Sequence, residues 1–201
     1  MKRHFLDLFS GLGGASEAFV HDLDNWTVLR IDNNPLLGGV PYTVIDDITQ
    51  IPVKHYDSAW KIDCIWASPP CTDFSGGFNS PKSKAARSPE GLDSYEPDMS
   101  LLLAAIDIIE TVKPKYWIIE NVVGSIRYFK EYLGEPRQII GPYVLWGNFP
   151  TLQVDKSRLD RKQDRDSTPH PLRSNRRAKV SFEVSRALKD AIENQKSITS
   201  F

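Results

Sequence analysis

The chain has few cysteines, which argues against a disulfide-rich protein and against a zinc site. Only two of its 201 residues are cysteine, Cys64 and Cys71. Two cysteines are too few for a framework of disulfides, so we expect a reducing compartment. Neither belongs to a Cys-x-x-Cys pair or has a histidine close by in the sequence, which disfavours zinc and predicts that no metal is bound.

The chain also lacks a long apolar run and an excess of charge of one sign. No apolar stretch is long enough to span a bilayer, and the Met-Lys-Arg-His start does not resemble a signal peptide, so we expect a cytoplasmic protein without membrane contact. Its 25 Lys and Arg nearly balance 26 Asp and Glu, so overall charge predicts no partner. Locally, residues 155–179 hold nine Lys or Arg against four Asp. That excess suits either a solvated loop or a surface that contacts nucleic-acid phosphates.

Strand-like apolar runs alternate with helical patterns through the first two thirds of the chain. The expected strands are residues 4–9, 27–32, 43–48, 62–68, 116–120 and 143–145. The expected helices are residues 14–23, 99–112 and 180–195. This alternation predicts an α/β fold with a mostly parallel sheet and helices on both faces. Residues 76–97 are rich in Gly, Ser and Pro and are expected to form a long loop, either a functional lid or disordered.

Two reactive side chains stand at the ends of expected strands, where ligands bind in sheets of this kind. Cys71 follows Pro69-Pro70, a rigid turn that favours an exposed thiol, and a thiolate is a strong nucleophile. Cys64 fits a buried small apolar residue better. Glu120 ends the run Tyr-Trp-Ile-Ile, where partial burial would raise its pKa and let it share a proton with a ring nitrogen. Helix capping or pairing with an arginine is the alternative for Glu120.

A glycine-rich turn, DLFSGLGG at residues 7–14, follows the first strand. Its glycines let the backbone turn tightly beside a ligand, although a purely structural turn remains an alternative. The spacing is not GxGxxG and the lysine of a P-loop is missing, so dinucleotide binding is disfavoured.

Acidic residues at the ends of the next two strands suit a nucleoside. Asp32 could accept hydrogen bonds from both ribose hydroxyls, and it also begins a sequence typical of a turn. Asp46 and Asp47 point to opposite sides of an extended chain, so only one can face a ligand. Asp47 could accept from an adenine amino group with Ile48 packed on the ring, or it could cap a turn or helix.

Taken in order, FSGLGG, Asp32, DDIT, PPCTDFS and IENV resemble the cytosine-C5 DNA methyltransferase family over about residues 4–124. The resemblance implies a Rossmann-like fold that binds S-adenosylmethionine. It also implies that Cys71 attacks C6 of a cytosine flipped out of DNA, that Glu120 contacts N3 and the amino group, and that C5 receives the methyl group. The residues it assigns to the cofactor are Phe9, Ser10, Gly11, Leu12, Gly13, Asp32, Asn33, Asp47, Ile48, Pro69, Leu101 and Val180.

The chain departs from the family pattern in its last third. The nearest counterpart of the family's Gln-x-Arg-x-Arg stretch is residues 136–138, which would make Arg137 a catalytic arginine. The residues Arg-Ala-Lys-Val at 177–180 stand where the family has Gly-Asn. The fifty or so residues after Phe149 are too few for a target-recognition domain of normal size. We therefore expect a catalytic domain at 1–150, a basic loop or minimal DNA-contacting segment at 151–179, and a C-terminal helix within 180–201 that packs back on it.

The small size of the chain also bears on its expected source and on whether it acts alone. Compact members of this sort are expected from viruses or mobile elements, acting as a monomer or with a partner protein that supplies specificity. The alternatives are cytosine-C5 methylation of RNA or of a free cytidine nucleotide, and a non-catalytic accessory subunit that binds the cofactor.

Overall fold

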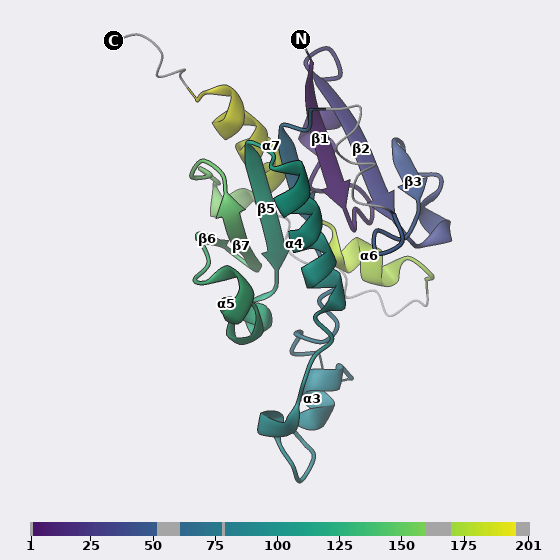
Figure 1. Cartoon of the computed structure of the whole chain (residues 1–201), viewed down its shortest axis with the longest axis vertical. Coiled ribbons are helices and arrows are strands. Elements are labelled where there is room, and N and C mark those ends of the chain that lie inside the picture. The colour runs from purple at the N-terminus through teal and green to yellow at the C-terminus, as the bar shows by residue number, and fades with distance from the viewer. Residues whose placement is uncertain (1, 52–60, 78, 160–169, 196–201) are drawn as a thin grey trace.

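A computed structural model describes residues 2–51, 61–77, 79–159 and 170–195. Within them the chain forms a seven-stranded sheet of order β3-β2-β1-β4-β5-β7-β6 (Figure 1). The strands are β1 (Arg3–Leu8), β2 (Trp26–Asp32), β3 (Thr43–Ile45), β4 (Cys64–Ala67), β5 (Tyr116–Asn121), β6 (Gln138–Ile140) and β7 (Tyr143–Asn148). The first five are parallel to one another, and β7 runs antiparallel to β5 and β6. The expected mostly parallel sheet is confirmed.

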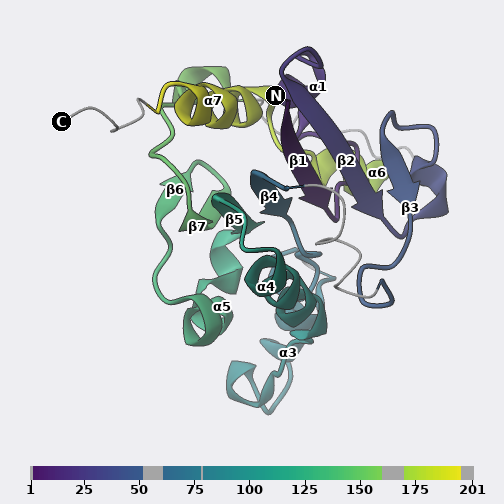
Figure 2. The same cartoon turned by 45° about the horizontal axis from the view of Figure 1, so that its top comes forward.

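Helices cover both faces of this sheet, as the alternation of apolar runs predicted (Figure 2). They are α1 (Glu17–Val20), α3 (Pro81–Ala85), α4 (Ser100–Val112), α5 (Ile126–Leu133), α6 (Arg173–Ala178) and α7 (Phe182–Glu193). Because successive side chains of a strand point to opposite faces, β1 contributes Phe5 to one core and Leu6 to the other. The core around Phe5 is closed by α1 and α7, and the core around Leu6 by α4 and α5. No described helix is long and apolar enough to cross a membrane.

Several elements differ from those expected, and α5 and α6 were not anticipated. The helix expected at 14–23 is only the four-residue α1, preceded by turns in the glycine-rich segment. The loop expected at 76–97 contains α3 and a 3-10 turn at Leu92–Ser94, because the Ser80 side chain caps α3 and Pro81 begins it. Strand β6 was not anticipated, since three residues are too short for a period-two pattern to stand out.

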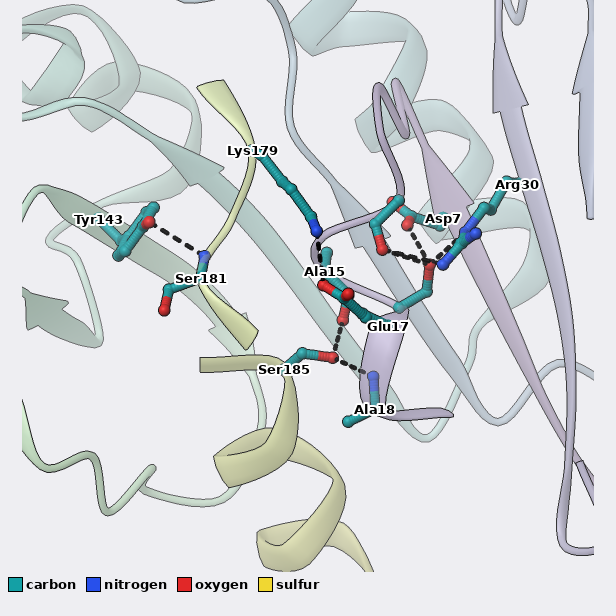
Figure 3. Close-up of polar contacts among 11 residues, drawn as sticks. Asp7, Ala15, Glu17, Ala18, Arg30, Tyr143, Lys179, Ser181 and Ser185 are labelled. Carbon is teal, nitrogen blue, oxygen red and sulfur yellow. Dashed lines mark hydrogen bonds and ion pairs between the residues drawn. The ribbon is translucent and has the colours of Figure 1, made fainter. Parts of the chain in front are cut away.

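The C-terminal helix α7 packs on α1, the helix that follows the glycine-rich turn. The Ser185 hydroxyl donates to the Ala15 carbonyl at 2.7 Å and accepts from the Ala18 N–H at 3.0 Å (Figure 3). Lys179 forms an ion pair with Glu17 at 2.8 Å. Val180 is 5% exposed, so it is part of the core. The end of the described chain thus supports the turn at residues 9–14. The expected domain limits stay predictions.

Gly14 allows this close approach, and a methyl group there is expected to be costly. A Cβ on Gly14 would lie 2.7 Å from the Val180 amide nitrogen and would collide with its carbonyl oxygen. We expect Gly14→Ala to lower the free energy of unfolding by about 2–3 kcal/mol, the usual cost of overpacking a rigid site. Gly39→Ala is the matched control, because its Cβ would meet nothing within 4 Å. Urea denaturation of both variants measures this, and equal stabilities would contradict the prediction.

Candidate active site and cofactor loop

Residues 9–14, which we call the cofactor loop, are held by three consecutive residues of β2. The Ser10 N–H donates to the Ile31 carbonyl at 3.1 Å, and the Gly11 N–H donates to Asp32 Oδ2 at 2.8 Å. Arg30 Nη2 donates to the Gly13 carbonyl at 2.9 Å. The loop leaves β1 at its carboxyl end, where ligands of parallel sheets bind. Its conformation is therefore fixed by the neighbouring strand.

The loop contains unusual backbone angles. Phe9 has a φ of 56°, Gly11 of 52° and Gly13 of 71°. A positive φ is strained for a side chain as large as that of Phe9, and such strain is concentrated at functional sites. This geometry supports a functional loop over a purely structural turn.

Two of the loop's three glycines, however, make room for protein. A Cβ on Gly13 would overlap the Arg30 guanidinium, and one on Gly14 would overlap the backbone of Val180. Only Gly11 has an open approach, with the Asn175 amide nitrogen 3.7 Å from the added carbon. Gly13 and Gly14 therefore have packing roles, and the assignment of Gly11 and Gly13 to the cofactor stays a prediction.

The two carboxylates expected to bind a nucleoside both make local turn contacts. Asp32 accepts from Gly11 through Oδ2 and, at 3.0 Å, from the Asn34 N–H through Oδ1. Asp47 Oδ1 accepts from the Thr49 N–H at 2.9 Å. The turn alternatives are thus realised. Because each carboxylate oxygen has about two acceptor directions, both groups can still bind ligand donors.

The remaining expected cofactor residues differ in exposure. Ile48 is 5% exposed and lies in the core beside α4, so little of it is left to face a ring. Asn33 is exposed, and Leu12 is half-buried on the loop. Among the described residues, the Ser10 hydroxyl is buried without a hydrogen-bond partner. A buried hydroxyl of this kind is costly, so a polar ligand group beside the loop fits this residue.

The turn that carries Cys71 is joined to the strand that carries Glu120. Ala67 at the end of β4 pairs with Ile119 of β5, so the two chains leave the sheet side by side. The buried Asn121 side chain then donates to the Pro69 carbonyl at 2.9 Å. Asn121 therefore has a structural role in holding the Cys71 turn. The two residues expected to do the chemistry follow neighbouring strands at the same edge of the sheet.

Beyond Cys71 the chain folds back on itself. The N–H groups of Phe74 and Ser75 donate to the Cys71 carbonyl at 3.0 and 2.9 Å. A cavity of about 70 Å³ lies between this turn and α4. Pro69 and Leu101, both expected to contact the cofactor, line it together. Pro69 and Leu101 are therefore brought together. The cavity has room only for water-sized molecules, which is less space than a nucleoside needs.

A second set of contacts, which we call the Lys82 clamp, also holds the turn that carries Cys71. The sequence analysis did not predict it. Lys82 Nζ donates to the Phe74 carbonyl at 3.4 Å and to the Gly124 carbonyl at 3.1 Å. A Cβ on Gly124 would collide with the Phe74 carbonyl oxygen. The only signal in the sequence is a glycine shortly after Glu-Asn-Val. The clamp fixes the Cys71 turn against the segment that follows β5.

Arg137 is not brought to this edge. Its guanidinium lies 5.4 Å over the Phe149 ring. Asn148, the residue before Phe149, pairs with Trp117 at the beginning of β5, whereas Glu120 lies near the strand's other end. The observed contact thus turns the Arg137 side chain away from Glu120 and Cys71. Its catalytic assignment remains a prediction that this position does not support.

Cys64 behaves as the sequence indicated. It lies in β4 with no exposed surface. Burial, followed by the nearby Asp63 and Asp7 carboxylates, raises the pKa of its thiol well above the ordinary value. A thiol held neutral in this way is a poor nucleophile. Of the two cysteines, only Cys71 is partly exposed.

A buried carboxyl lies beneath the cofactor loop and predicts a pH effect on stability. Burial raises the pKa of Asp7 to about 7, although a hydrogen bond from Ser16 and the charge of Arg30 oppose the shift. Asp7 therefore stabilises the fold most below pH 4, and this contribution is lost as the pH rises towards 7. Three units correspond to about 4 kcal/mol as an upper bound. We expect the stability of the wild type, relative to Asp7→Asn, to fall between pH 4 and 8 in urea denaturation; a constant difference would contradict this.

The basic segment expected at 155–179 is partly helical. Its residues 160–169 lie outside the described residues, and residues 173–178 form α6. The Asn175 side chain accepts from Asn34 Nδ2 at 3.5 Å, beside the cofactor loop. The exposed Arg176 and Arg177 of α6 are therefore carried at the carboxyl edge of the sheet.

These features define an α/β protein with a glycine-rich loop and a thiol-bearing turn at one edge of its sheet, and the comparisons with known proteins name the class. Residues 3–132 match the model of the C-5 cytosine-specific DNA methylase family. The chain belongs to that family.

Individual relatives are distant. The chain is 29% identical to a probable DNA (cytosine-5)-methyltransferase of Frog virus 3, over 71% of this chain and 64% of that protein. It is 26% identical to the type II methyltransferase M.DdeI of Desulfomicrobium norvegicum, over 69% of this chain and 34% of that protein. A solved structure of a Spodoptera frugiperda DNMT2 mutant aligns at a TM-score of 0.46 and 21% identity, covering 77% of this chain and 54% of that one. The chain spans less than two thirds of the length of these curated relatives.

Proposed function

We propose that this chain transfers a methyl group from S-adenosylmethionine to C5 of cytosine in DNA, through a covalent bond between Cys71 and C6. The observation that carries the proposal is the hydrogen bond from Asn121 to the Pro69 carbonyl. It joins the segment of Glu120 to the turn of Cys71, so that one substrate ring could meet both side chains. A thiol and a carboxyl so joined suit an acceptor carbon that must first be activated.

The chemistry divides between these two residues. The Cys71 thiolate adds to C6 and forms a carbon–sulfur bond, while Glu120 holds a proton at N3 as electron density moves into the ring. C5 then becomes enamine-like and nucleophilic; S-adenosylmethionine, when bound, supplies the methyl group. Loss of the C5 proton to a base restores the double bond and expels the Cys71 thiolate. Each step needs a reduced cysteine, in line with the expected reducing compartment.

The cofactor loop fits the remaining requirement. The buried Ser10 hydroxyl and the open approach at Gly11 offer room and polarity for the cofactor. Asp32 would accept from the ribose hydroxyls, and Asp47 from the adenine amino group. Phe9, Leu12 and Leu101 would add apolar contacts.

The DNA assignment rests on the family and on charge. Arg176 and Arg177 of α6 offer cations beside the loop that could contact the phosphates of a polymer. A target base must leave the helix to reach Cys71, and residues 79–97, which follow the Cys71 turn, would act as the lid that closes behind it. Sequence specificity supplied by a partner, and action as a monomer, remain parts of the proposal.

The test is transfer of labelled methyl groups to duplex DNA, single-stranded DNA, RNA and dCMP in parallel, with the product base identified by mass spectrometry. We expect label in DNA as 5-methylcytosine. Label confined to RNA or dCMP would show that the same reaction acts on that substrate and not on DNA. Cofactor binding with no transfer anywhere would favour an accessory subunit and overturn the proposed activity.

A further inference from the structure

A buried arginine lies in β2 beneath the cofactor loop. Arg30 continues the row of side chains begun by Trp26 and Val28, which face the core closed by α1 and α7. It is only 4% exposed. A guanidinium in such a place destabilises the fold unless its donors are paired and its charge is compensated.

The Arg30 donors are paired in three directions. Nε donates to the Ser16 hydroxyl at 2.8 Å, Nη2 to the Gly13 carbonyl at 2.9 Å and Nη1 to the Pro41 carbonyl at 3.0 Å. Ser16 in turn donates to Asp7 Oδ2 at 2.6 Å, so a carboxyl from β1 completes the network (Figure 3). One side chain therefore links the cofactor loop, the start of α1 and the connection between β2 and β3.

Two of these linked segments flank the proposed cofactor site. The loop carries Ser10 and Gly11, and the connection through Pro41 leads into β3 and on to Asp47. We propose that Arg30 is a positioning residue for the cofactor, which sets the spacing between the loop and the chain leading to Asp47. The proposal rests on the proposed function for the identity of the cofactor.

The geometry requires arginine and excludes lysine. Three acceptors in three directions match the planar fork of a guanidinium, whereas an ammonium on a flexible stem reaches one or two of them. A Cβ on Gly13 would overlap the guanidinium, so the fork lies directly against the loop backbone. Charged and titratable groups that act on Arg30 are Asp7, Glu17 and Tyr42. Arg30→Lys keeps the charge towards all three and changes the number and the directions of the hydrogen bonds.

The experiment compares wild type with Arg30→Lys in two measurements. The first is amide hydrogen exchange of the cofactor-free protein, read at the Gly13 and Thr43 N–H groups, which donate to Ser10 and Val40 carbonyls. The second is calorimetric binding of S-adenosylmethionine, together with KM and kcat. We expect faster exchange at both amides, a Kd and cofactor KM raised about tenfold, and a kcat at saturating cofactor within about twofold of wild type.

Lys189→Ala is the control for a loss of stability that leaves the loop intact. Lys189 is a half-buried cation that pairs with Asp22 and Glu193 on the side of α1 and α7 away from β3. We expect it to lower the melting temperature without changing cofactor affinity. If Arg30→Lys behaved in the same way, or lowered kcat alone, the positioning role would be wrong.

The two proposals fail separately. If the wild type bound no S-adenosylmethionine, the proposed function would be refuted. The exchange measurement needs no cofactor, and unchanged exchange at Gly13 or at Thr43 in Arg30→Lys would overturn the role of Arg30 by itself.

Discussion

Cys71→Ala is expected to lower the rate of methyl transfer by at least about 10³-fold, because removing a covalent nucleophile leaves only binding and orientation. Without addition at C6, C5 of cytosine is too weak a nucleophile to take the methyl group. Affinity for S-adenosylmethionine should be unchanged, because the substitution shortens only the Cys71 side chain, which is assigned to the substrate base, and leaves Pro69 and the cofactor loop in place. Transfer to duplex DNA at saturating cofactor measures the first effect, and calorimetry the second.

The matched control is Cys64→Ala, which removes the other thiol. Cys64 is buried in β4, and its raised pKa keeps it neutral. We expect this variant to lose at most about 1–2 kcal/mol of stability through a small cavity and to keep its turnover.

A DNA duplex with fluorine at C5 adds an independent readout: the C5 substituent cannot leave as a proton, so a DNA-bound protein should persist on a denaturing gel. Retention of a tenth or more of the activity by Cys71→Ala, or an adduct in that variant, would refute the mechanism.

Gly124→Ala is expected to reduce kcat about 10²-fold, the scale of loss that a displacement of about 1 Å causes at a reacting centre. The new methyl group would collide with the Phe74 carbonyl oxygen. Relief requires the turn after Cys71 to move away from the segment after β5, because a backbone atom cannot rotate aside as a side chain can. Lys82, which bridges the two through its ammonium group, would then lose one of its acceptors.

The steady-state kinetics of three proteins test this expectation. Gly39→Ala adds the same methyl group where nothing lies within 4 Å, so it should retain wild-type kcat and stability. Gly124→Ala should lose kcat while cofactor affinity is retained, because the cofactor loop does not contact Gly124. A wild-type kcat in Gly124→Ala would show that the position of the Phe74 carbonyl does not govern the reaction.

Much of the candidate site was visible as local pattern. Pro69-Pro70 before Cys71 indicated a rigid turn, and the structure places that turn after β4, fixed through the Pro69 carbonyl. Asp32 at the end of β2 was expected to serve as a turn residue, a ligand, or both, and its turn contacts are present. Such features are predictable because they depend on neighbours a few residues apart. Arg137 was chosen as the nearest match to a family stretch, and its contact with the Phe149 ring is one that the local pattern did not predict.

The sequence by itself determined every strand except β6, the helices α4 and α7, the two-faced sheet and the burial of Cys64. Only the tertiary structure decided what Gly13 and Gly14 are for: they face Arg30 and Val180. It likewise joined Lys82 to Gly124, 42 positions apart. The physical reason is that periodicity and turn chemistry are local properties of a chain, whereas close backbone approaches and buried hydrogen bonds depend on which distant segments meet.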